Sequence, residues 1–410
     1  MTGRERILLT FEHREPDRVP LFEQGVASRV ASDILGRRAL TGGGAFRFQA
    51  ALAAYHGPDA WAEFQARYLE DYAALAEALD FDMVSLPWTG AGPPSERLDQ
   101  RTLRLDNPVT GTWSTFRFDE ASDTFQEVDS AFRSEGLLAV ERYVAALARL
   151  GAGNDEHTDM SDAGPQGNAG PQGNALPGSP LRSGSPLHFL IERFGRGTTR
   201  AKERAVAAGV TIAVPMQEPW LQAMALRPDL IDAYLDSQLE ANLTHIDRLA
   251  KAGVDVIWGG GDLATNKGPI YSPAACRRFL QPRLRAMTER CHAHGLPYVF
   301  RSDGWLWPIA QELFVESDVD GYGEIDAQAG MKVGELKARL PHLTLWGGVD
   351  CAGALTSGTP AEVAEETRRA LEAGAPGGGY ILGSSNVIHA GVKTENFLEM
   401  VRAHRQYGGY

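Results

Sequence analysis

Short apolar runs recur along the chain, and most of them are separated by segments with helical periodicity. The runs do not alternate between apolar and polar residues, so they indicate strands that are buried on both faces. Eight such runs are present: Val19–Glu23, Phe81–Leu86, Val210–Pro215, Val254–Gly259, Tyr298–Ser302, Gly321–Ile325, Thr344–Gly348 and Gly379–Leu382. Their number and order predict an α/β fold, a (β/α)8 barrel of the TIM type.

Capping signals mark three of the helices expected between the later runs. A helix that begins after Ser272 is predicted to extend to His294, and a helix that begins after Thr359 should end near Gly374. A third is predicted from Pro228 to Gly253. A cap residue, a proline in the first turn and a glycine after the last turn are the usual order at helix ends.

The regular order is interrupted between the second and third runs. Thr102–Leu105 and Thr112–Phe118 predict a β-hairpin outside the barrel. Residues 151–185 are rich in Gly, Pro, Ser and Asn and contain the sequence AGPQGN twice in tandem. This composition predicts a flexible insert that is removable without loss of the fold, with an active-site lid as the alternative. We therefore expect residues 1–410 to form one domain that carries the insert.

Composition narrows the class of partner. The net charge of −13 argues against a surface for nucleic acid or anionic membrane, and no apolar run is long enough to span a bilayer. The three cysteines, Cys276, Cys291 and Cys351, form no C-x-x-C pair. Charged residues at the N-terminus are not followed by the apolar region of a signal peptide. These features predict a cytoplasmic protein with a small-molecule partner.

Polar side chains stand at or just after the predicted strand ends, where barrel enzymes keep their chemistry. They are Glu23, Trp88, Asp262, Arg301, Asp303, Glu324, Asp350, Cys351, Asn386 and His389. Taken singly, each has a structural alternative, such as a helix cap or a salt bridge at the rim. Taken together, they predict one site, because unlike charges at buried strand ends are typical of tuned acid–base groups.

Arg301 is the central residue of this hypothesis. A permanently charged planar donor at the end of a buried strand needs an acidic partner, either from the protein or as a carboxylate or phosphate of a ligand. The protein partner would be Asp303. Otherwise Arg301 binds substrate, and Asp303, Asp262 and Glu324 are the candidate catalytic groups. The remaining strand-end residues are expected to line the substrate.

Motifs for metals and nucleotides are missing from the sequence. The chain has no His-x-Cys and no His-Glu-x-x-His, and its glycine groups do not form G-x-G-x-x-G. The residues therefore predict no metal and no bound nucleotide.

Several segments carry a family resemblance: Pro16-Asp17-Arg18-Val19-Pro20, Gly261-Asp262, Tyr271-Ser272-Pro273, Ser302-Asp303-Gly304, Gly347-Gly348-Val349-Asp350, and Gly379-Tyr380-Ile381-Leu382 with Glu395-Asn396. Together they resemble the uroporphyrinogen decarboxylase superfamily. The resemblance implies a β/α barrel, a possible homodimer, and one of two activities. Those activities are metal-free porphyrinogen decarboxylation and zinc-dependent methyl transfer with corrinoid proteins or thiol acceptors.

The chain departs from the motifs of both activities. The arginine-rich segment with which porphyrinogen decarboxylases grip substrate carboxylates does not follow Pro20, so uroporphyrinogen itself is not the expected substrate. The zinc ligands of the thiol methyltransferases correspond in position to Arg301, Asp303 and Asn386, and arginine does not bind a metal.

Three hypotheses remain open. The first is a metal-free lyase of the decarboxylase type, without a cofactor, whose carboxylated substrate is held by Arg301. The alternative is a subunit of a methyltransferase or demethylase that works with a corrinoid protein, with a metal such as zinc on Glu324, Cys351 and His389. The third is a non-catalytic barrel that binds a metabolite.

Overall fold

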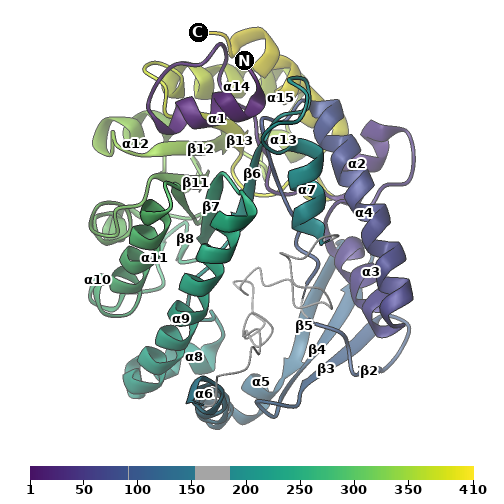
Figure 1. Cartoon of the computed structure of the whole chain (residues 1–410), viewed down its shortest axis with the longest axis vertical. Coiled ribbons are helices and arrows are strands. Elements are labelled where there is room, and N and C mark those ends of the chain that lie inside the picture. The colour runs from purple at the N-terminus through teal and green to yellow at the C-terminus, as the bar shows by residue number, and fades with distance from the viewer. Residues whose placement is uncertain (91, 153–184) are drawn as a thin grey trace.

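A curled parallel sheet forms the centre of the computed structural model, which describes residues 1–90, 92–152 and 185–410 (Figure 1). Seven strands lie in the order β1-β6-β7-β10-β11-β12-β13 and pair in parallel. They are β1 (Met83–Ser85), β6 (Ala205–Gly209), β7 (Val256–Gly260), β10 (Tyr298–Arg301), β11 (Gly321–Ile325), β12 (Thr344–Val349) and β13 (Tyr380–Ser384). Six of the eight predicted runs therefore overlap a strand of this sheet.

The first predicted run, Val19–Glu23, is not a regular strand. It makes one bridge, between Leu21 and Leu382, because Pro20 has no N–H to continue a ladder. The segment nevertheless lies between the two edge strands. Leu382 N donates to Pro20 O at 2.8 Å on the β13 side, and Asp82 N donates to Leu21 O at 2.9 Å on the β1 side.

The prediction of a strand at the third run, Val210–Pro215, is wrong. The strand at this place is β6, five residues earlier, with the small side chains of Ala-Val-Ala-Ala-Gly. Val210 N still donates to Trp258 O at 2.8 Å, and the chain then leaves the sheet. Ile212 and Val214 are buried in a loop, so their apolar character reflects burial in the core and not pairing in the sheet.

Helices surround the sheet at the places where the caps predict them. Helix α9 (Pro228–Ala252) ends at Gly253 with φ of +93°, and α14 (Pro360–Gly374) begins with a capping box between Thr359 and Glu362. The predicted helix after Ser272 is present as α10 (Pro273–Ala275), a π-helical turn and α11 (Gln281–Ala293). The other helices are α1 (Gly3–Phe11), α2 (Ser28–Leu35), α3 (Gly44–Tyr55), α4 (Pro58–Leu79), α5 (Ala131–Glu135), α6 (Leu137–Ala152), α7 (Pro186–Phe194), α8 (Glu218–Leu226), α12 (Val333–Arg339), α13 (Ala354–Ser357) and α15 (Thr394–Tyr407).

A second sheet stands apart from the first, between β1 and β6 in the chain (Figure 1). The predicted antiparallel pair is present as β3 (Thr102–Asn107) and β4 (Thr112–Asp119), and β2 (Glu96–Arg97) and β5 (Thr124–Ser130) extend it to four strands. Gly111 N donates to Asn107 O at 2.8 Å in the turn. A short pair, β8 (Ala264–Thr265) and β9 (Gly268–Pro269), follows β7.

Most of the predicted insert, residues 151–185, lies outside the described residues. Of its ends, residues 151 and 152 belong to α6, and Ser185 caps α7.

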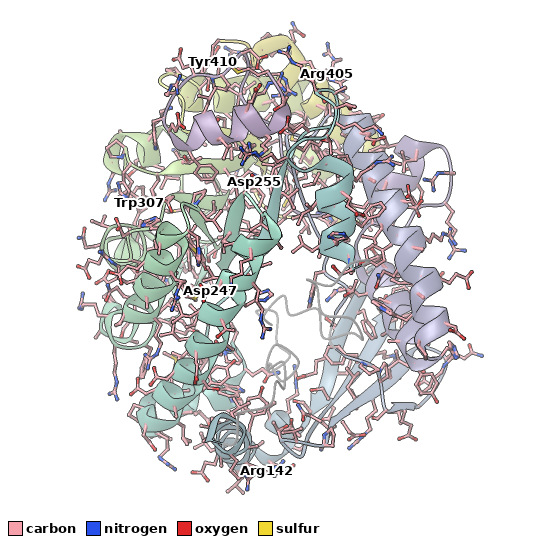
Figure 2. The ribbon with its side chains drawn as sticks, viewed as in Figure 1. Arg142, Asp247, Asp255, Trp307, Arg405 and Tyr410 are labelled. Atoms are coloured by element: carbon pink, nitrogen blue, oxygen red, sulfur yellow. The ribbon has the colours of Figure 1, made fainter. Side chains whose placement is uncertain are left out.

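A layer of large side chains fills the concave side of the parallel sheet. Phe22, Trp258 and Trp346 are its largest members, and Ile7 of α1 packs against the same cluster. Helix α1 therefore covers the amino ends of the strands, near Asp255 (Figure 2). Arg4 Nε of this helix lies 2.7 Å from Asp255 Oδ1. In the part of the chain that the structure describes, no helix is both long and apolar enough to cross a membrane.

Candidate active site

Two loops at the carboxyl ends of β7 and β10 hold the aspartates of the site. Asp262 follows β7, and Asp303 follows Arg301, the last residue of β10. Ser302 connects the two loops, since its Oγ accepts a hydrogen bond from Leu263 N at 3.2 Å and donates one to Asp303 O at 3.0 Å. Gly304 has φ of +81°, and a Cβ there would lie 2.7 Å from the Ala264 carbonyl carbon. This close approach requires glycine.

The guanidinium of Arg301 is paired with Glu324. Its Nη1 lies 3.0 Å from Glu324 Oε1 and 3.3 Å from Gln24 Oε1. The guanidinium lies over the ring of Trp258, with Cζ 4.8 Å from the ring centroid. Among the described residues no partner meets the buried Nε or accepts from Nη2. The internal partner of Arg301 is therefore Glu324 and not Asp303, and part of its donor capacity is unused.

Glu324 reaches Arg301 because β11 is irregular at this point. Strict alternation would place Glu324 on the same face as Tyr322, which packs among the helices. The pairing with β12 shifts between Tyr322 and Ile325, and Glu324 has φ of +66°. A bulge of this kind redirects a side chain, and a non-glycine residue in this conformation costs about 1–2 kcal/mol. The ion pair and the amide of Gln24, which donates to the same carboxylate, stabilise the arrangement.

Three carboxyl groups and one guanidinium share the site. Burial raises the pKa of Asp262 to about 6, the charges of Glu324 and Asp303 raise it as well, and Arg301 opposes them. Burial, followed by the charge of Glu324, also raises the pKa of Asp303, although Asn386 Nδ2 donates to its carboxylate at 3.1 Å. A carboxyl group with a pKa near neutrality exchanges its proton readily at physiological pH. Asp262 has this property.

Glu23 is buried beside β13 and is held by Ser384. Its carboxyl accepts from Ser384 N at 2.7 Å, and Ser384 Oγ lies 2.6 Å from its other oxygen. The same hydroxyl lies 2.5 Å from Asn386 O. A hydroxyl has one proton, and a carbonyl only accepts, so the two contacts are both satisfied when Glu23 carries a proton of its own. Burial raises the pKa of Glu23 to about 8, in the same direction.

Cys351 and His389 form a neighbouring cluster around Thr356. The Thr356 hydroxyl donates to Cys351 O at 2.6 Å and lies 3.2 Å from His389 Nε2. His389 Nδ1 accepts from Gly391 N at 3.1 Å, so the neutral ring carries its proton on Nε2. Burial raises the pKa of the Cys351 thiol to about 11. Asp350 closes a local turn by accepting from Gly353 N at 3.0 Å.

Trp88 lies at the mouth of a pocket beside β1 and is 39% exposed. The guanidinium of Arg47, from α3, stacks on it at 4.6 Å from the ring centroid. Trp258, which supports Arg301, lines the same pocket.

Three residues of the site are not among those predicted from the sequence: Gln24, Trp258 and Ser384. Gln24 is polar and directly follows the predicted Glu23, so its position in the sequence could have marked it as a candidate. Trp258 stands inside an apolar run and reads as core, and Ser384 gives no signal without its partner.

The outcome for the predicted residues is mixed. The structure brings Asp262, Arg301, Asp303, Glu324 and Asn386 into one electrostatic cluster. Glu23, Cys351 and His389 lie in adjoining hydrogen-bonded groups, while Asp350 serves its own turn. The proposed metal set of Glu324, Cys351 and His389 is not assembled, since no three His, Cys, Asp or Glu residues in the described part of the chain form a metal-holding group.

Comparison with known proteins bears on the carboxyl-terminal half of the chain most directly. Residues 206–407 match the family model described as uroporphyrinogen decarboxylase (URO-D). No curated protein matches the chain. Among solved structures, the chain is similar to a methyltransferase from Methanosarcina mazei, with a TM-score of 0.60, 15% sequence identity and coverage of 99% of both chains. At this identity the likeness is one of fold.

Proposed function

We propose that the chain is a metal-free lyase of the decarboxylase type, since residues 206–407 match the uroporphyrinogen decarboxylase family model. Its substrate is a small carboxylated molecule whose carboxylate binds Arg301. One observation carries this proposal: a guanidinium with unused donors stands in the same cluster as a carboxyl group whose pKa is about 6.

In the proposed decarboxylation, Asp262, Asp303 and Glu324 have separate roles. A proton first adds to the substrate carbon that bears the carboxylate, which puts positive charge on the substrate. The carbon–carbon bond then breaks, its electron pair neutralises that charge, and carbon dioxide leaves. Asp262 supplies the proton, because a group with a pKa near the working pH is both protonated often enough and acidic enough. Asp303 stabilises positive charge that develops on the substrate. Glu324 is the counter-ion of Arg301 and not a proton carrier.

The fold proposal follows the same resemblance. We take the segment around Leu21 as the eighth position of a (β/α)8 barrel, because it lies between β13 and β1 with backbone hydrogen bonds to both.

Arg301→Lys tests the carboxylate contact. Benzoate serves as a simple carboxylate probe. An ammonium keeps the charge of the guanidinium but loses its planar two-bond geometry. Because a charge-assisted hydrogen bond contributes roughly 1.5–3 kcal/mol, we expect the affinity for benzoate to fall about ten- to a hundredfold. Isothermal titration calorimetry measures it. Arg339→Lys is the matched control, since Arg339 also stacks on a tryptophan, at 3.7 Å from the Trp307 ring, and pairs with Glu335 at 2.9 Å, but it is exposed.

An unchanged affinity together with a lower unfolding temperature would reduce Arg301 to a structural partner of Glu324. The proposal would then lose its centre.

Asp262→Asn tests the proton donor. With a substrate identified, the rate of the protonation step should fall as pH rises through about 6, because the donor is lost on ionisation. The asparagine variant should lack this limb and lose most of the activity. A wild-type pH profile that is flat between pH 5 and pH 8 would assign the proton to another group.

A methyltransferase that works with a corrinoid partner is the second candidate, supported by the name of the similar Methanosarcina structure. The residues present do not fit zinc. Arg301 stands where the resemblance places a ligand, Glu324 is held by Arg301, and the Cys351 thiol resists ionisation. Metal analysis of the purified protein separates the candidates. One zinc per chain, or methyl transfer to free cob(I)alamin, would replace the lyase proposal, and ligand binding without turnover would favour the non-catalytic barrel.

A further inference from the structure

A second guanidinium stands near the carboxyl end of the parallel sheet without an acidic partner. Arg47 of α3 lies over the ring of Trp88, which follows β1, with Cζ 4.6 Å from the ring centroid. Among the described residues, Arg47 makes no hydrogen bond and no ion pair. Arg301, by contrast, is already paired with Glu324. Arg47 is therefore the less compensated of the two cations.

The neighbours of Arg47 in the helix fix the direction of its side chain. Phe46 packs against Tyr68 at 5.5 Å between ring centroids, and Phe48 stacks on Phe118 at 5.0 Å. Successive side chains of a helix point about 100° apart. Because both phenylalanines are held in aromatic clusters, the helix has the rotation that carries Arg47 to Trp88.

One carboxylate lies near Arg47 but caps the helix instead of pairing with it. Asp123 Oδ1 accepts a hydrogen bond from Ala45 N at 2.6 Å, in the first turn of α3. Asp123 acts on Arg47 through its charge alone, and burial lowers the pKa of the guanidinium. None of the Arg47 nitrogens is among the fully buried, unpartnered atoms of the described chain, so an anion can reach them. Such an anion would supply the charge-assisted hydrogen bonds that the protein does not.

The two arginine–tryptophan pairs stand at one end of the sheet. Trp88 and Trp258 border the same small cavity, which at about 30 Å³ is too small for a substrate group but shows that the two indoles are neighbours. Strands β6 and β7 separate β1 from β10. With neighbouring strands about 4.8 Å apart, the ends of β1 and β10 are up to roughly 14 Å apart. A molecule that reaches both guanidiniums must therefore be elongated.

We infer that Arg47 is a second anion-binding residue of this site, and that the substrate is an elongated molecule with an oxyanion, a carboxylate or a phosphate, at the end that meets Arg47. The carboxylate at Arg301 rests on the proposed function. The anion at Arg47 is argued from the unpaired guanidinium and its tryptophan.

Matched probes isolate the second anion. Suberate has a carboxylate at both ends, and its monomethyl ester has the same chain with one charge fewer. In calorimetric titrations at low ionic strength, suberate should bind the wild type about tenfold more tightly than the ester. Glutarate is too short to reach both arginines and should gain little over its own monomethyl ester.

The two sources of the anion are distinguished by ω-phosphonoheptanoate. Tighter binding than suberate assigns a phosphate to the Arg47 end, and weaker binding assigns a carboxylate.

Arg47→Gln should bring suberate down to the level of its ester and leave the ester unchanged. Arg104→Gln is the matched control, since Arg104 also stacks on a tryptophan, at 4.4 Å from the Trp113 ring, but pairs with Asp106 at 3.0 Å in the second sheet. It removes the same charge and should leave the gain of suberate intact. Circular dichroism checks the fold, and Arg47→Met replaces the glutamine variant if that variant does not fold.

The inference is overturned if Arg47→Gln leaves the affinity for suberate unchanged, or if glutarate gains as much as suberate over its ester. Failure of the proposed function gives a different pattern. In that case Arg301→Lys changes neither affinity, suberate and its ester bind about equally through Arg47, and both weaken in Arg47→Gln. Arg47 then remains an anion-binding residue without the contact at Arg301.

Discussion

At the scale of single residues, the main feature of the site is that its buried carboxyl groups differ in protonation state. Asp262 and Asp303 share a site with Glu324, and Glu23 stands buried nearby, yet one guanidinium is available to the cluster. Carboxyl groups that are buried in excess over cations keep their protons to higher pH. Glu23 is the clearest case, because its contacts with Ser384 are satisfied by the neutral acid.

Glu23→Gln should reveal this proton as a pH-dependent gain in stability. The pKa of Glu23 in the folded protein is about 8, against an ordinary value of 4.5, so between these values the folded state binds more protons than the unfolded state and wild-type stability falls as pH rises. The amide does not titrate. We expect the two proteins to be similar at pH 4.5 and the glutamine variant to gain up to a few kcal/mol by about pH 8, and to level off above that.

Chemical denaturation across this pH range measures the difference. Glu335→Gln, at an exposed ion pair of α12, is the control and should show little pH dependence. A stability difference between wild type and Glu23→Gln that is constant with pH would mean that Glu23 is ionised in the folded protein.

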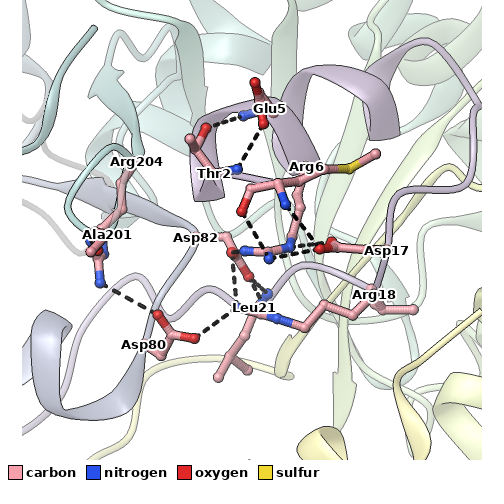
Figure 3. Close-up of polar contacts among 12 residues, drawn as sticks. Thr2, Glu5, Arg6, Asp17, Arg18, Leu21, Asp80, Asp82, Ala201 and Arg204 are labelled. Carbon is pink, nitrogen blue, oxygen red and sulfur yellow. Dashed lines mark hydrogen bonds and ion pairs between the residues drawn. The ribbon is translucent and has the colours of Figure 1, made fainter. Parts of the chain in front are cut away.

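At the scale of elements, a buried aspartate fastens the N-terminal segment to the sheet. Asp82, which precedes β1 and is 1% exposed, accepts hydrogen bonds from Leu21 N at 2.8 Å, Arg6 Nη1 at 3.0 Å and Arg18 Nη1 at 2.6 Å (Figure 3). It thereby joins α1, the segment through Leu21 and β1. This junction fills the interval between the edge strands of the sheet.

Asp82→Asn should therefore destabilise the fold. The change removes the buried charge that Arg6 and Arg18 share, while Arg6 keeps its pair with Asp17 and Arg18 its pair with Asp80. Breaking a buried ion pair costs about 3–5 kcal/mol, and we expect a loss at the lower end of this range. Asp17→Asn is matched to it, since Asp17 pairs with the same Arg6 at 2.5 Å but its side chain is 45% exposed, and it should cost about 1 kcal/mol or less. Equal losses in urea denaturation would show that the junction at Asp82 does not hold the segment.

At the scale of the whole molecule, the parallel sheet and the helices beyond it share one core. Trp220 of α8 is fully buried and packs against Phe132, Tyr143 and Tyr234, at centroid distances of 5.5, 5.8 and 4.6 Å. These aromatic residues come from α5, α6 and α9. The cluster connects the helices near the second sheet to α9, one of the helices that line the pocket beside Trp88.

Trp220→Leu should separate stability from binding. The cavity left by the larger ring is expected to cost about 2–4 kcal/mol. Affinity for benzoate should stay unchanged, because Trp220 packs among the helices and Arg301 rests on a different tryptophan. Thermal unfolding and calorimetry measure the two effects, and Tyr55→Leu, at a 39% exposed position, serves as the control. A loss of benzoate affinity in Trp220→Leu would show that the helix cluster shapes the site around Arg301.

The sequence by itself determined the features that depend on neighbours along the chain. Helix ends at Pro228, Gly253 and Thr359 are local, because caps and glycine turns act over a few residues, and the structure has them where they are predicted. Runs of apolar residues located six of the strands, since burial on both faces removes alternation. The polar strand ends also marked Asp262, Arg301, Asp303 and Glu324 as neighbours.

Only the tertiary structure decided how those neighbours pair. Sequence reasoning offered Asp303 as the partner of Arg301, but the bulge in β11 turns Glu324 toward it. Gln24 completes the contact from the segment that lies between the two edge strands. The same holds for β6, where small side chains form the strand and the more apolar run after it forms a loop. Pairing, bulges and pockets depend on residues that are hundreds of positions apart, so no local pattern contains them.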